Sequence, residues 1–281
     1  MYRCPLCQQP LIANAAGLNC SNRHQFDRAR EGYFHLLPVQ QKKSLTPGDS
    51  AEMIQARRAF LEAGFYQPLS DAVNQLLLST TSETAATISP NTTPAQLALL
   101  DIGCGEGYYS NRLAQALPQL QVYGIDISKA AVKAASKKYP QLHCAVASSY
   151  HLPFADQSFA LLLRIYAPSE PSELARVAAP GALLLTVTPA PEHLLQLKQQ
   201  IYQEVRLHPA QIQQQPGFQH QKRQQLSWIF QPDKAAELEQ LLQMIPLGYK
   251  VNAELKQQLL QQLPAIKLDF YLDLYQRVLS A

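Results

Sequence analysis

The stretch Leu100-Asp101-Ile102-Gly103-Cys104-Gly105-Glu106-Gly107 decides which fold this sequence predicts. A buried strand ends in an acid, a glycine-rich turn follows, and a helix begins. Glycines at such a turn let the backbone approach a ligand closely. A turn that binds a dinucleotide reads G-x-G-x-x-G, whereas this one reads G-x-G-x-G with an acid before it. A pyrophosphate prefers a helix N-terminus without a nearby carboxylate. The stretch therefore favours a zwitterionic ligand that carries positive charge.

The sequence on either side of this turn alternates between apolar runs and amphipathic runs. Strands are expected at 97–100, 122–127, 142–147, 159–166 and 182–188, with helices at 107–117, 129–138 and 170–177. This alternation implies right-handed crossovers and a doubly wound, mostly parallel α/β sheet. Later strands at 226–230 and 266–274 would close one edge as a hairpin and bring the sheet to seven strands. Helices are expected at 192–204, 233–244 and 253–262.

The glycine turn resembles motif I of class I S-adenosylmethionine-dependent methyltransferases, which implies a Rossmann-like sheet and that cofactor. Asp101 and Gly103 then belong to the cofactor turn. Gly124-Ile125-Asp126 strengthens the resemblance, because an acid after the second strand can accept both ribose hydroxyls. The segment 152–159, with Leu-Pro-Phe and a following Asp, also resembles the family. Many relatives have an acid after the third strand for the adenine amino group, and this chain has Ser148 there.

A second cluster of chemistry lies at the N-terminus, where three of the five cysteines fall in the pattern Cys4-x2-Cys7 and Cys20-x3-His24. Two tight turns with this spacing can present thiolates and an imidazole to one tetrahedral Zn²⁺. A redox C-x-x-C normally lies beside a βαβ pattern, which is missing here. A disulfide disagrees with the odd cysteine count and the lack of a signal peptide, which predict a reduced cytosolic protein. Four protein ligands leave no position for a catalytic water, so we expect a structural zinc.

The composition divides the chain into three parts. Residues 1–37 form a zinc-binding module, too small to bury a core without its metal. Residues 38–95 contain a basic loop, a helix capped by Asp49 or Ser50 and ending near Leu61, a second helix at 68–78, and a flexible linker at 79–95. Residues 96–281 form the methyltransferase domain. The apolar runs are too short to cross a bilayer, so we expect a cytoplasmic protein with no membrane partner.

The net charge of +3 lies entirely in residues 1–64, which carry eight Lys/Arg against five Asp/Glu, while the remainder carries sixteen of each. This asymmetry favours a polyanionic partner that meets the N-terminal part first. An ordinary solvated face explains the charge equally well. The basic residues that would contact phosphates are Arg23, Arg28, Arg30, Lys42, Lys43, Arg57 and Arg58.

Taken whole, the chain resembles a narrower group, the bacterial enzymes that methylate N1 of a guanine in a hairpin loop of 23S ribosomal RNA. The zinc cluster, residues 32–38, residues 47–66 and Arg164-Ile165-Tyr166-Ala167-Pro168 carry this resemblance. A zinc module ahead of a methyltransferase core is more specific than either part alone. The resemblance implies a 23S ribosomal RNA hairpin as partner and a homodimer.

Further cofactor contacts also follow only from this resemblance. Tyr66 would cover the cofactor, Gly105 and Glu106 would hold its methionine part, and His193 would close the site. From the residues alone, Tyr66 would be a helix-packing tyrosine and His193 a surface histidine.

The chemistry of methyl transfer to guanine N1 makes two demands on the protein. The displacement is in line, so the protein mainly positions nucleophile, methyl and sulfur. N1 also carries a proton that a base must take, and a side chain or a water could serve. Tyr166 and Pro168 follow the fourth strand at the ligand edge of the sheet, where Tyr166 can stack on the base and Pro168 can fix the turn. The Asn/Asp-Pro-Pro-aromatic motif of amino-group methyltransferases is absent there.

Two other functions fit parts of the sequence. A small-molecule methyltransferase, for instance of quinone precursors, would share the core but not the zinc module. A non-catalytic RNA-binding module would not need an intact glycine turn together with the two matched acids Asp101 and Asp126. The zinc module and the complete cofactor motifs together favour the ribosomal RNA enzyme.

Overall fold

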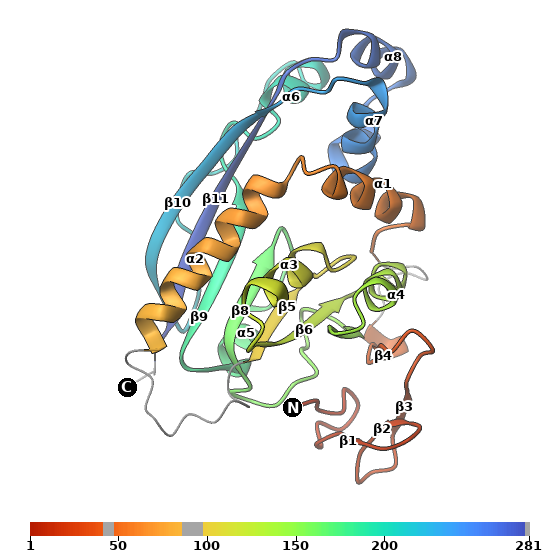
Figure 1. Cartoon of the computed structure of the whole chain (residues 1–281), viewed down its shortest axis with the longest axis vertical. Coiled ribbons are helices and arrows are strands. Elements are labelled where there is room, and N and C mark those ends of the chain that lie inside the picture. The colour runs from red at the N-terminus through yellow and green to blue at the C-terminus, as the bar shows by residue number, and fades with distance from the viewer. Residues whose placement is uncertain (42–47, 86–97, 279–281) are drawn as a thin grey trace.

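The computed structural model describes residues 1–41, 48–85 and 98–278 of the chain, and Figure 1 shows how they are arranged. These residues form a large mixed sheet of eight strands and a small antiparallel sheet of three. The small sheet contains β1 (Ile12–Ala13), β2 (Gly17–Asn19) and β3 (Gln25–Asp27). No helix in the described part of the chain has the length and hydropathy needed to span a bilayer.

The large sheet has the order β10-β11-β9-β8-β5-β6-β7-β4. Strands β4 (Phe34–His35), β7 (His143–Val146), β6 (Gln121–Asp126), β5 (Ala98–Ile102), β8 (Phe159–Ile165) and β9 (Ala178–Pro189) run parallel, and β11 (Ile266–Arg277) and β10 (Phe218–Phe230) add antiparallel pairs. The expected mostly parallel, doubly wound sheet is therefore confirmed, including the closing hairpin. Seven strands belong to the predicted core, and β4 from the N-terminal segment adds an eighth.

The strand order reverses at β5, which pairs with β6 on one side and β8 on the other. Successive connections leave toward opposite edges at this point, so a crevice opens beyond the carboxyl ends of the two strands. All five residues of β5 are buried. Leu99 belongs to the apolar layer on one face of the sheet and Leu100 to the layer on the other. This burial fixes the cofactor turn at the end of a rigid strand.

The helices form where the sequence predicts them. Within the sheet's crossovers these are α3 (Tyr108–Ala116), α4 (Lys129–Lys138) and α5 (Pro171–Val177), and later in the chain α6 (Leu195–Ile201), α7 (Ala235–Met244), η3 (Pro246–Lys250) and α8 (Ala253–Gln262). Before the core lie η1 (Val39–Gln41), α1 (Ala51–Glu62) and α2 (Gln67–Ala85). Ser50 caps α1, because its side chain accepts the Met53 N–H. The last three helices lie at the end of the long β10–β11 hairpin (Figure 1).

Helix α2 is longer than predicted, because it continues to Ala85 through the first part of the expected linker. The Ser79 and Thr80 hydroxyls donate hydrogen bonds of 3.0 and 2.7 Å to the Leu76 carbonyl, so these polar residues bond back to the helix. The rest of the predicted linker, residues 86–95, lies outside the described residues, as does 42–47 of the predicted basic loop.

The N-terminal segment is built into the edge of the core. Strand β4 pairs with β7, placing Phe34 opposite Ala145. The Tyr2 ring stacks on Phe154 at 5.1 Å between centroids and contacts Tyr123 edge-on at 5.8 Å. These contacts make the segment a continuation of the sheet rather than a tethered module.

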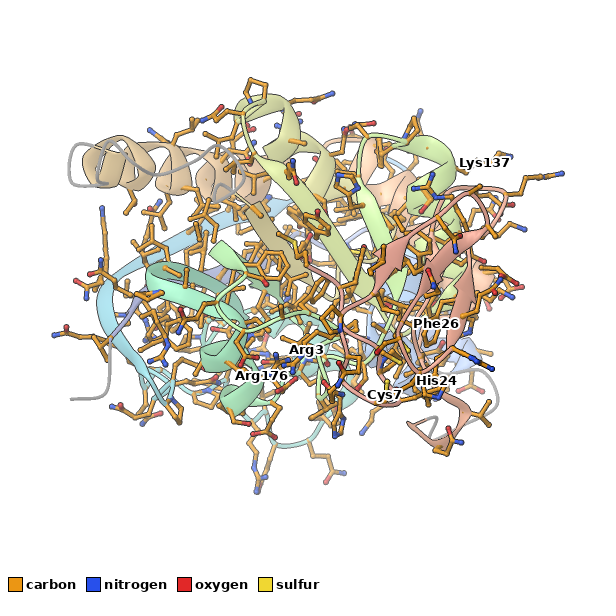
Figure 2. The ribbon with its side chains drawn as sticks, turned by 90° about the horizontal axis from the view of Figure 1, so that it is seen from below. Arg3, Cys7, His24, Phe26, Lys137 and Arg176 are labelled. Carbon is orange, nitrogen blue, oxygen red and sulfur yellow. The ribbon has the colours of Figure 1, made fainter. Side chains whose placement is uncertain are left out.

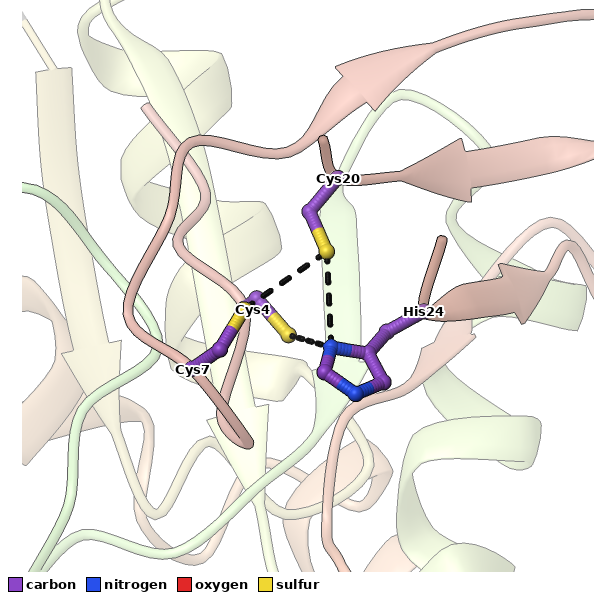
Figure 3. A group of neighbouring side chains, drawn as sticks. All are labelled: Cys4, Cys7, Cys20 and His24. Atoms are coloured by element: carbon purple, nitrogen blue, oxygen red, sulfur yellow. Dashed lines mark hydrogen bonds between the residues drawn. The ribbon is translucent and has the colours of Figure 1, made fainter. Parts of the chain in front are cut away.

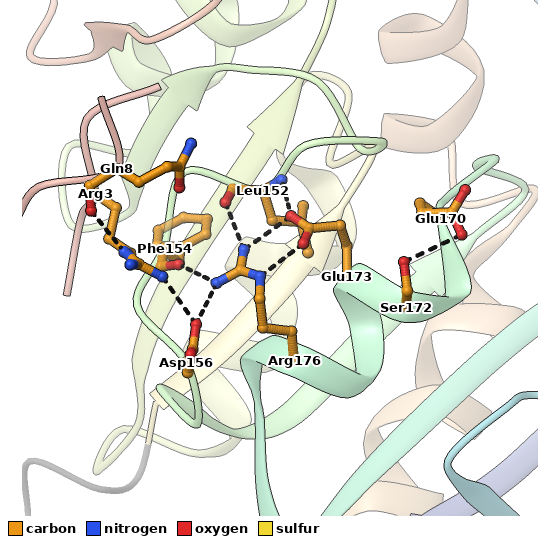
Figure 4. Close-up of polar contacts among 9 residues, drawn as sticks. All are labelled: Arg3, Gln8, Leu152, Phe154, Asp156, Glu170, Ser172, Glu173 and Arg176. Carbon is orange, nitrogen blue, oxygen red and sulfur yellow. Dashed lines mark hydrogen bonds and ion pairs between the residues drawn. The ribbon is translucent and has the colours of Figure 1, made fainter. Parts of the chain in front are cut away.

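An ionic network reinforces the same junction (Figure 4). Arg176 of α5 forms a bidentate pair with Glu173 at 2.6 and 2.8 Å. Asp156 accepts from both Arg176 at 2.8 Å and Arg3 at 3.0 Å, and so connects the first residues of the chain to α5. Seen from below, Arg3 lies beside Arg176, and the labelled zinc-segment residues Cys7 and His24 lie to one side (Figure 2).

Candidate functional site

A cavity of about 1240 Å³ opens at the carboxyl ends of β5, β6 and β8, where the strand order reverses. One wall carries the cofactor turn, and the opposite wall carries the segment after β9. Helix α1 and the segment from α7 into η3 contribute further residues. The polar, aromatic and turn residues of the lining include Asp49, Arg57, Tyr66, Asp101, Gly103, Gly105, Glu106, Tyr109, Asp126, Tyr166, Pro168, His193, Leu194, Lys198 and His208.

The glycine turn depends on Gly103. Its φ of +77° lies in the left-handed region, and a Cβ built there would be 2.4 Å from the Ala167 side chain. A larger residue would therefore strain the backbone and push away the segment after β8. The turn is also anchored to β6, because the Gly103 and Cys104 N–H groups both donate to the Ile125 carbonyl. The turn and the loop after β8 thus form one continuous floor.

Three acids face this cavity. Asp101 is 2% exposed, its carboxylate accepts the Ser110 hydroxyl at 2.5 Å, and burial raises its pKa to about 7. Burial also raises the pKa of Glu106 and Asp126. Taking a carboxylate out of water is costly unless a positive group compensates it. A cationic ligand would relieve that cost, so the cavity is suited to one.

The Asp126 carboxylate is held in position by the backbone. Its two oxygens accept the Gly105 N–H at 3.0 Å and the Ser128 N–H at 2.8 Å. Each carboxylate oxygen can accept more than one hydrogen bond. Asp126 therefore keeps capacity for ribose hydroxyls, as the sequence predicts.

Two further residues are suited to bind the carboxylate of a zwitterionic ligand. The Tyr109 hydroxyl is buried and has no hydrogen-bond partner among the described residues. Arg57 forms an ion pair with Asp49 and also lines the cavity. A hydroxyl donor and a guanidinium can bind a carboxylate. With Asp101 and Glu106 available for the ammonium and sulfonium groups and Asp126 for the ribose, the residues present fit S-adenosylmethionine.

The structure places two other predicted cofactor residues at the cavity. Tyr66 and His193 are 5% and 6% exposed and both belong to its lining. The Tyr66 ring contacts Phe60, Trp228 and Phe270 edge-on, so it is part of an aromatic cluster. Neither residue is a surface side chain.

Ser148 does not join the lining, although its neighbours Ala147 and Ser149 do. Its hydroxyl accepts the Tyr150 N–H at 3.2 Å, and its backbone bridges His151. The side chain therefore closes a turn after β7. In this structure an adenine contact would come from the neighbouring residues.

The two predicted substrate-pocket residues, Tyr166 and Pro168, lie on the cavity wall after β8. The Tyr166 ring is 44% exposed and lies 6.2 Å from the His193 ring and 5.7 Å from Phe270. Tyr166 and Leu194 have positive φ angles of 57° and 58°. Non-glycine residues in this region are strained, and such strain gathers at binding sites.

Several residues of the lining have no sequence signal that would reveal them. Arg57 and Arg58 are predicted to contact phosphates; in the structure Arg57 pairs with Asp49, and Arg58 lies 3.8 Å from Glu62 within α1. Long side chains reach partners that local patterns do not reveal. Lys198 and His208 were missed because a lysine in a glutamine-rich segment and an isolated histidine carry no motif.

The four predicted zinc ligands converge (Figure 3). Cys4 Sγ and Cys20 Sγ each lie 3.4 Å from His24 Nδ1, and Cys7 Sγ lies 3.6 Å from Cys20 Sγ. All four ligand atoms fall within 4.8 Å of one another. A tetrahedral Zn²⁺ with thiolate and imidazole ligands separates them by about 3.3–3.8 Å. The donor set and its spacing fit one structural zinc, which would leave no open position.

Comparison with known proteins supports both the zinc module and the methyltransferase domain. Residues 2–45 match the zinc-ribbon family described as "RlmA, N-terminal", and residues 99–181 match the family described as "Methyltransferase domain". A 23S rRNA (guanine(748)-N(1))-methyltransferase of Streptomyces fradiae is 35% identical, over 69% of this chain and 65% of its own.

Two further relatives carry similar names. A putative 23S rRNA (guanine-N(1)-)-methyltransferase of Micromonospora griseorubida is 36% identical over 69% of this chain and 68% of its own. The putative 23S rRNA (guanine-N(1)-)-methyltransferase YxjB of Bacillus subtilis (strain 168) is 34% identical over 72% and 69%. The chain thus aligns with about two thirds of the length of each relative.

Proposed function

Because the chain belongs to the family of 23S rRNA (guanine-N(1))-methyltransferases, we propose that it transfers a methyl group from S-adenosylmethionine to N1 of a guanine in 23S ribosomal RNA. The observation that supports this proposal most strongly is that one cavity has two chemically different sides. Asp126 and the buried acids Asp101 and Glu106 line the cofactor end, and an exposed, strained Tyr166 lines the other. A ribosomal RNA substrate would place this activity in the cytoplasm.

The contacts in the cavity indicate which residues would bind each part of the cofactor. The cofactor, when bound, supplies an electrophilic methyl group on its sulfonium. Asp126, held by two backbone N–H groups, would accept the ribose hydroxyls. Asp101 and Glu106 would offset the positive charges, while Tyr109 would donate to the carboxylate. The protein's contribution is then mainly orientation and charge.

The guanine would occupy the side of the cavity between Tyr166 and His193. A flipped or unpaired base is commonly held by stacking on an aromatic ring. Tyr166 offers an exposed ring face, and Pro168 limits the freedom of the loop that follows it. N1 of guanine is inaccessible inside a Watson–Crick pair, so the target must be unpaired. This supports a nucleotide in a hairpin loop.

The zinc module would bind the RNA outside the cavity. Arg23, Arg28 and Arg30 are exposed on it, and Lys137 is exposed at the end of the neighbouring α4. Figure 2 shows Lys137 extending away from the body of the protein on the side of the zinc module. Such residues can contact phosphates without reading sequence. Zinc would shape this surface rather than take part in the chemistry.

We also propose that the protein forms a homodimer, as the sequence resemblance implies. In the described part of the chain, β10 pairs only with β11, so its other edge is open along thirteen residues. Ile229 on this strand is 57% exposed. A second copy could pair along this edge. Sedimentation should show a dimer, and a monomer at micromolar concentration would contradict this part of the proposal.

The activity is tested by methyl transfer in parallel reactions. The protein is incubated with tritiated S-adenosylmethionine and either unmodified 23S ribosomal RNA or a lipid extract. We expect label in RNA only, and RNA binding should weaken steeply with salt because phosphate contacts release counterions. Label in the lipid arm alone would favour a small-molecule methyltransferase and contradict the proposal.

A further inference from the structure

The lining of the cavity includes a buried amine that has no hydrogen-bond partner among the described residues. Lys198, on α6, is 8% exposed, and its Nζ is buried without a hydrogen bond to any described residue. The residue nevertheless belongs to the cavity lining, together with His193 and Leu194. Buried amines normally find a carboxylate or another acceptor. An unpartnered one beside a ligand cavity points to a ligand.

No carboxylate of the described residues lies within hydrogen-bond distance of the Lys198 amine. Asp269, on the neighbouring β11, accepts from Gln225 at 2.8 Å and from the Glu192 N–H at 3.3 Å. The Glu192 carboxylate pairs with Lys267. His193 and His208 interact electrostatically with the amine. Further ionisable residues of the lining in this part of the cavity are Tyr202, Glu204, Arg206 and Lys250.

The electrostatics of this wall favour an uncharged amine. Burial lowers the pKa of Lys198, because an ammonium in this position loses its hydration. Burial, with His208 and Lys198 nearby, also lowers the pKa of His193 to about 3. Both histidines have lowered pKa values, so both are neutral at neutral pH. A desolvated lysine gives up its proton more readily than an exposed one, and the free amine can then accept a proton from a ligand.

The other groups on this side are poorer proton acceptors. His193 Nδ1 already accepts the Asp269 N–H at 3.2 Å, so the remaining ring nitrogen carries the proton. Although Tyr166 as a whole is 44% exposed, desolvation of its hydroxyl raises the pKa well above the ordinary value, so the hydroxyl keeps its proton. The three acids line the cofactor end of the cavity, where positive charge is expected.

We propose that Lys198 Nζ is the general base that removes the N1 proton of the target guanine, an inference that rests on the proposed function. The N1–H bond breaks and its proton moves to the amine. The electron pair left on N1 forms the bond to the methyl group, while the bond between that methyl group and sulfur breaks. The resulting ammonium returns its proton to solvent. Lys198 reaches the base by rotating its four-carbon stem within the cavity that it already lines.

The test uses three substitutions in the full-length protein, Lys198→Met, Lys198→Arg and Lys198→Ala. Methionine keeps the length and removes the base, and arginine is permanently charged and cannot lose its proton. We expect single-turnover methyl transfer to fall by about 10²–10⁴ in both. Affinity for S-adenosylmethionine and for RNA should stay within about twofold, and Tm should not fall, because no partner is lost. The matched control is Lys234→Met, which replaces an exposed lysine at the start of α7.

Two readouts separate proton transfer from other roles. The rate of the parent protein should rise with pH and then level off, and small primary amines should restore activity to Lys198→Ala. NMR of ¹³Cε-labelled lysine should show Lys198 titrating below the exposed value of about 10.4. Full activity in Lys198→Arg would show that the residue acts as a cation and would overturn the proposal. So would an unchanged rate in Lys198→Met.

The activities of the parent protein and of Lys198→Met together separate the proposed function from the role of Lys198. If the parent protein transfers no methyl group to RNA, the proposed function is wrong. If the parent is active and Lys198→Met is equally active, only the role of Lys198 is wrong.

Discussion

Replacing Asp101 by asparagine should stabilise the cofactor-free protein at pH 8 while weakening its affinity for S-adenosylmethionine. Asp101 is 2% exposed, and burial raises its pKa from the ordinary 3.8 to about 7. An acid whose pKa is higher in the folded state binds its proton more tightly there. Folding stability contributed by this group is therefore greatest at low pH and is lost as the pH rises from about 4 to about 7.

The structure sets the size of this effect. Each pKa unit corresponds to about 1.4 kcal/mol. The rise in the pKa of Asp101 from 3.8 to about 7 therefore lowers the folding stability by about 4 kcal/mol at pH 8. At pH 5, where the folded protein keeps the proton, the same linkage predicts a loss of folding stability of about 2 kcal/mol relative to low pH. Asparagine has nearly the same shape, and its amide oxygen can still accept the Ser110 hydroxyl. We therefore expect the substitution to relieve most of this cost.

The measurement is urea unfolding of the parent and Asp101→Asn at both pH values without cofactor, followed by calorimetry of cofactor binding. Asp156→Asn is a control of opposite sign, because the hydrogen bond from Arg176 lowers the pKa of Asp156 and its charge is stabilising. Equal stability of the parent and Asp101→Asn at pH 8 would refute the reasoning. A gain of the same size at pH 5 and pH 8 would refute it as well.

Three further predictions concern the cofactor, the metal and the target. Asp126→Ala should weaken S-adenosylmethionine affinity by at least about tenfold, since hydrogen bonds to a charged acceptor contribute about 1.5–3 kcal/mol each; calorimetry showing parental affinity would contradict the assignment. A Cys7→Ser, Cys20→Ser variant should lose RNA binding in filter retention and also melt at lower temperature, because Tyr2 joins the zinc module to the core. Retained RNA binding would show that zinc has another role. A hairpin RNA should be methylated faster than the same strand annealed to its complement, and equal rates would exclude an unpaired target.

Much of the fold could be predicted because local signals and burial agree. Helix α4 runs from Lys129 to Lys138 as expected, since Ser128 caps it and the apolar residues recur at helical spacing. Asp101 and Asp126, at the carboxyl ends of β5 and β6, line the same cavity, because parallel strands end at the same edge. The four zinc ligands were found from spacing alone.

The parts that were not predicted depend on contacts between distant segments. Strand β10 begins at Phe218, although only 226–230 was expected, because its polar first half is stabilised by pairing with β11 rather than by its own composition. Strand β4 has only two residues and no strand signature, and it forms because β7 offers an open edge. Lys198 lacked any signal, since its significance lies in a missing partner.

The identity of the methylated atom tests the central claim most directly. Unmodified 23S ribosomal RNA is incubated with the protein and S-adenosylmethionine, digested to nucleosides and separated by chromatography with mass detection. We predict 1-methylguanosine, together with a reverse-transcription stop at one looped guanine, because a methyl group on N1 blocks Watson–Crick pairing. The Asp126→Ala variant should give far less of this product. A methyl group on the exocyclic amine of guanine, or on another base, would contradict the account.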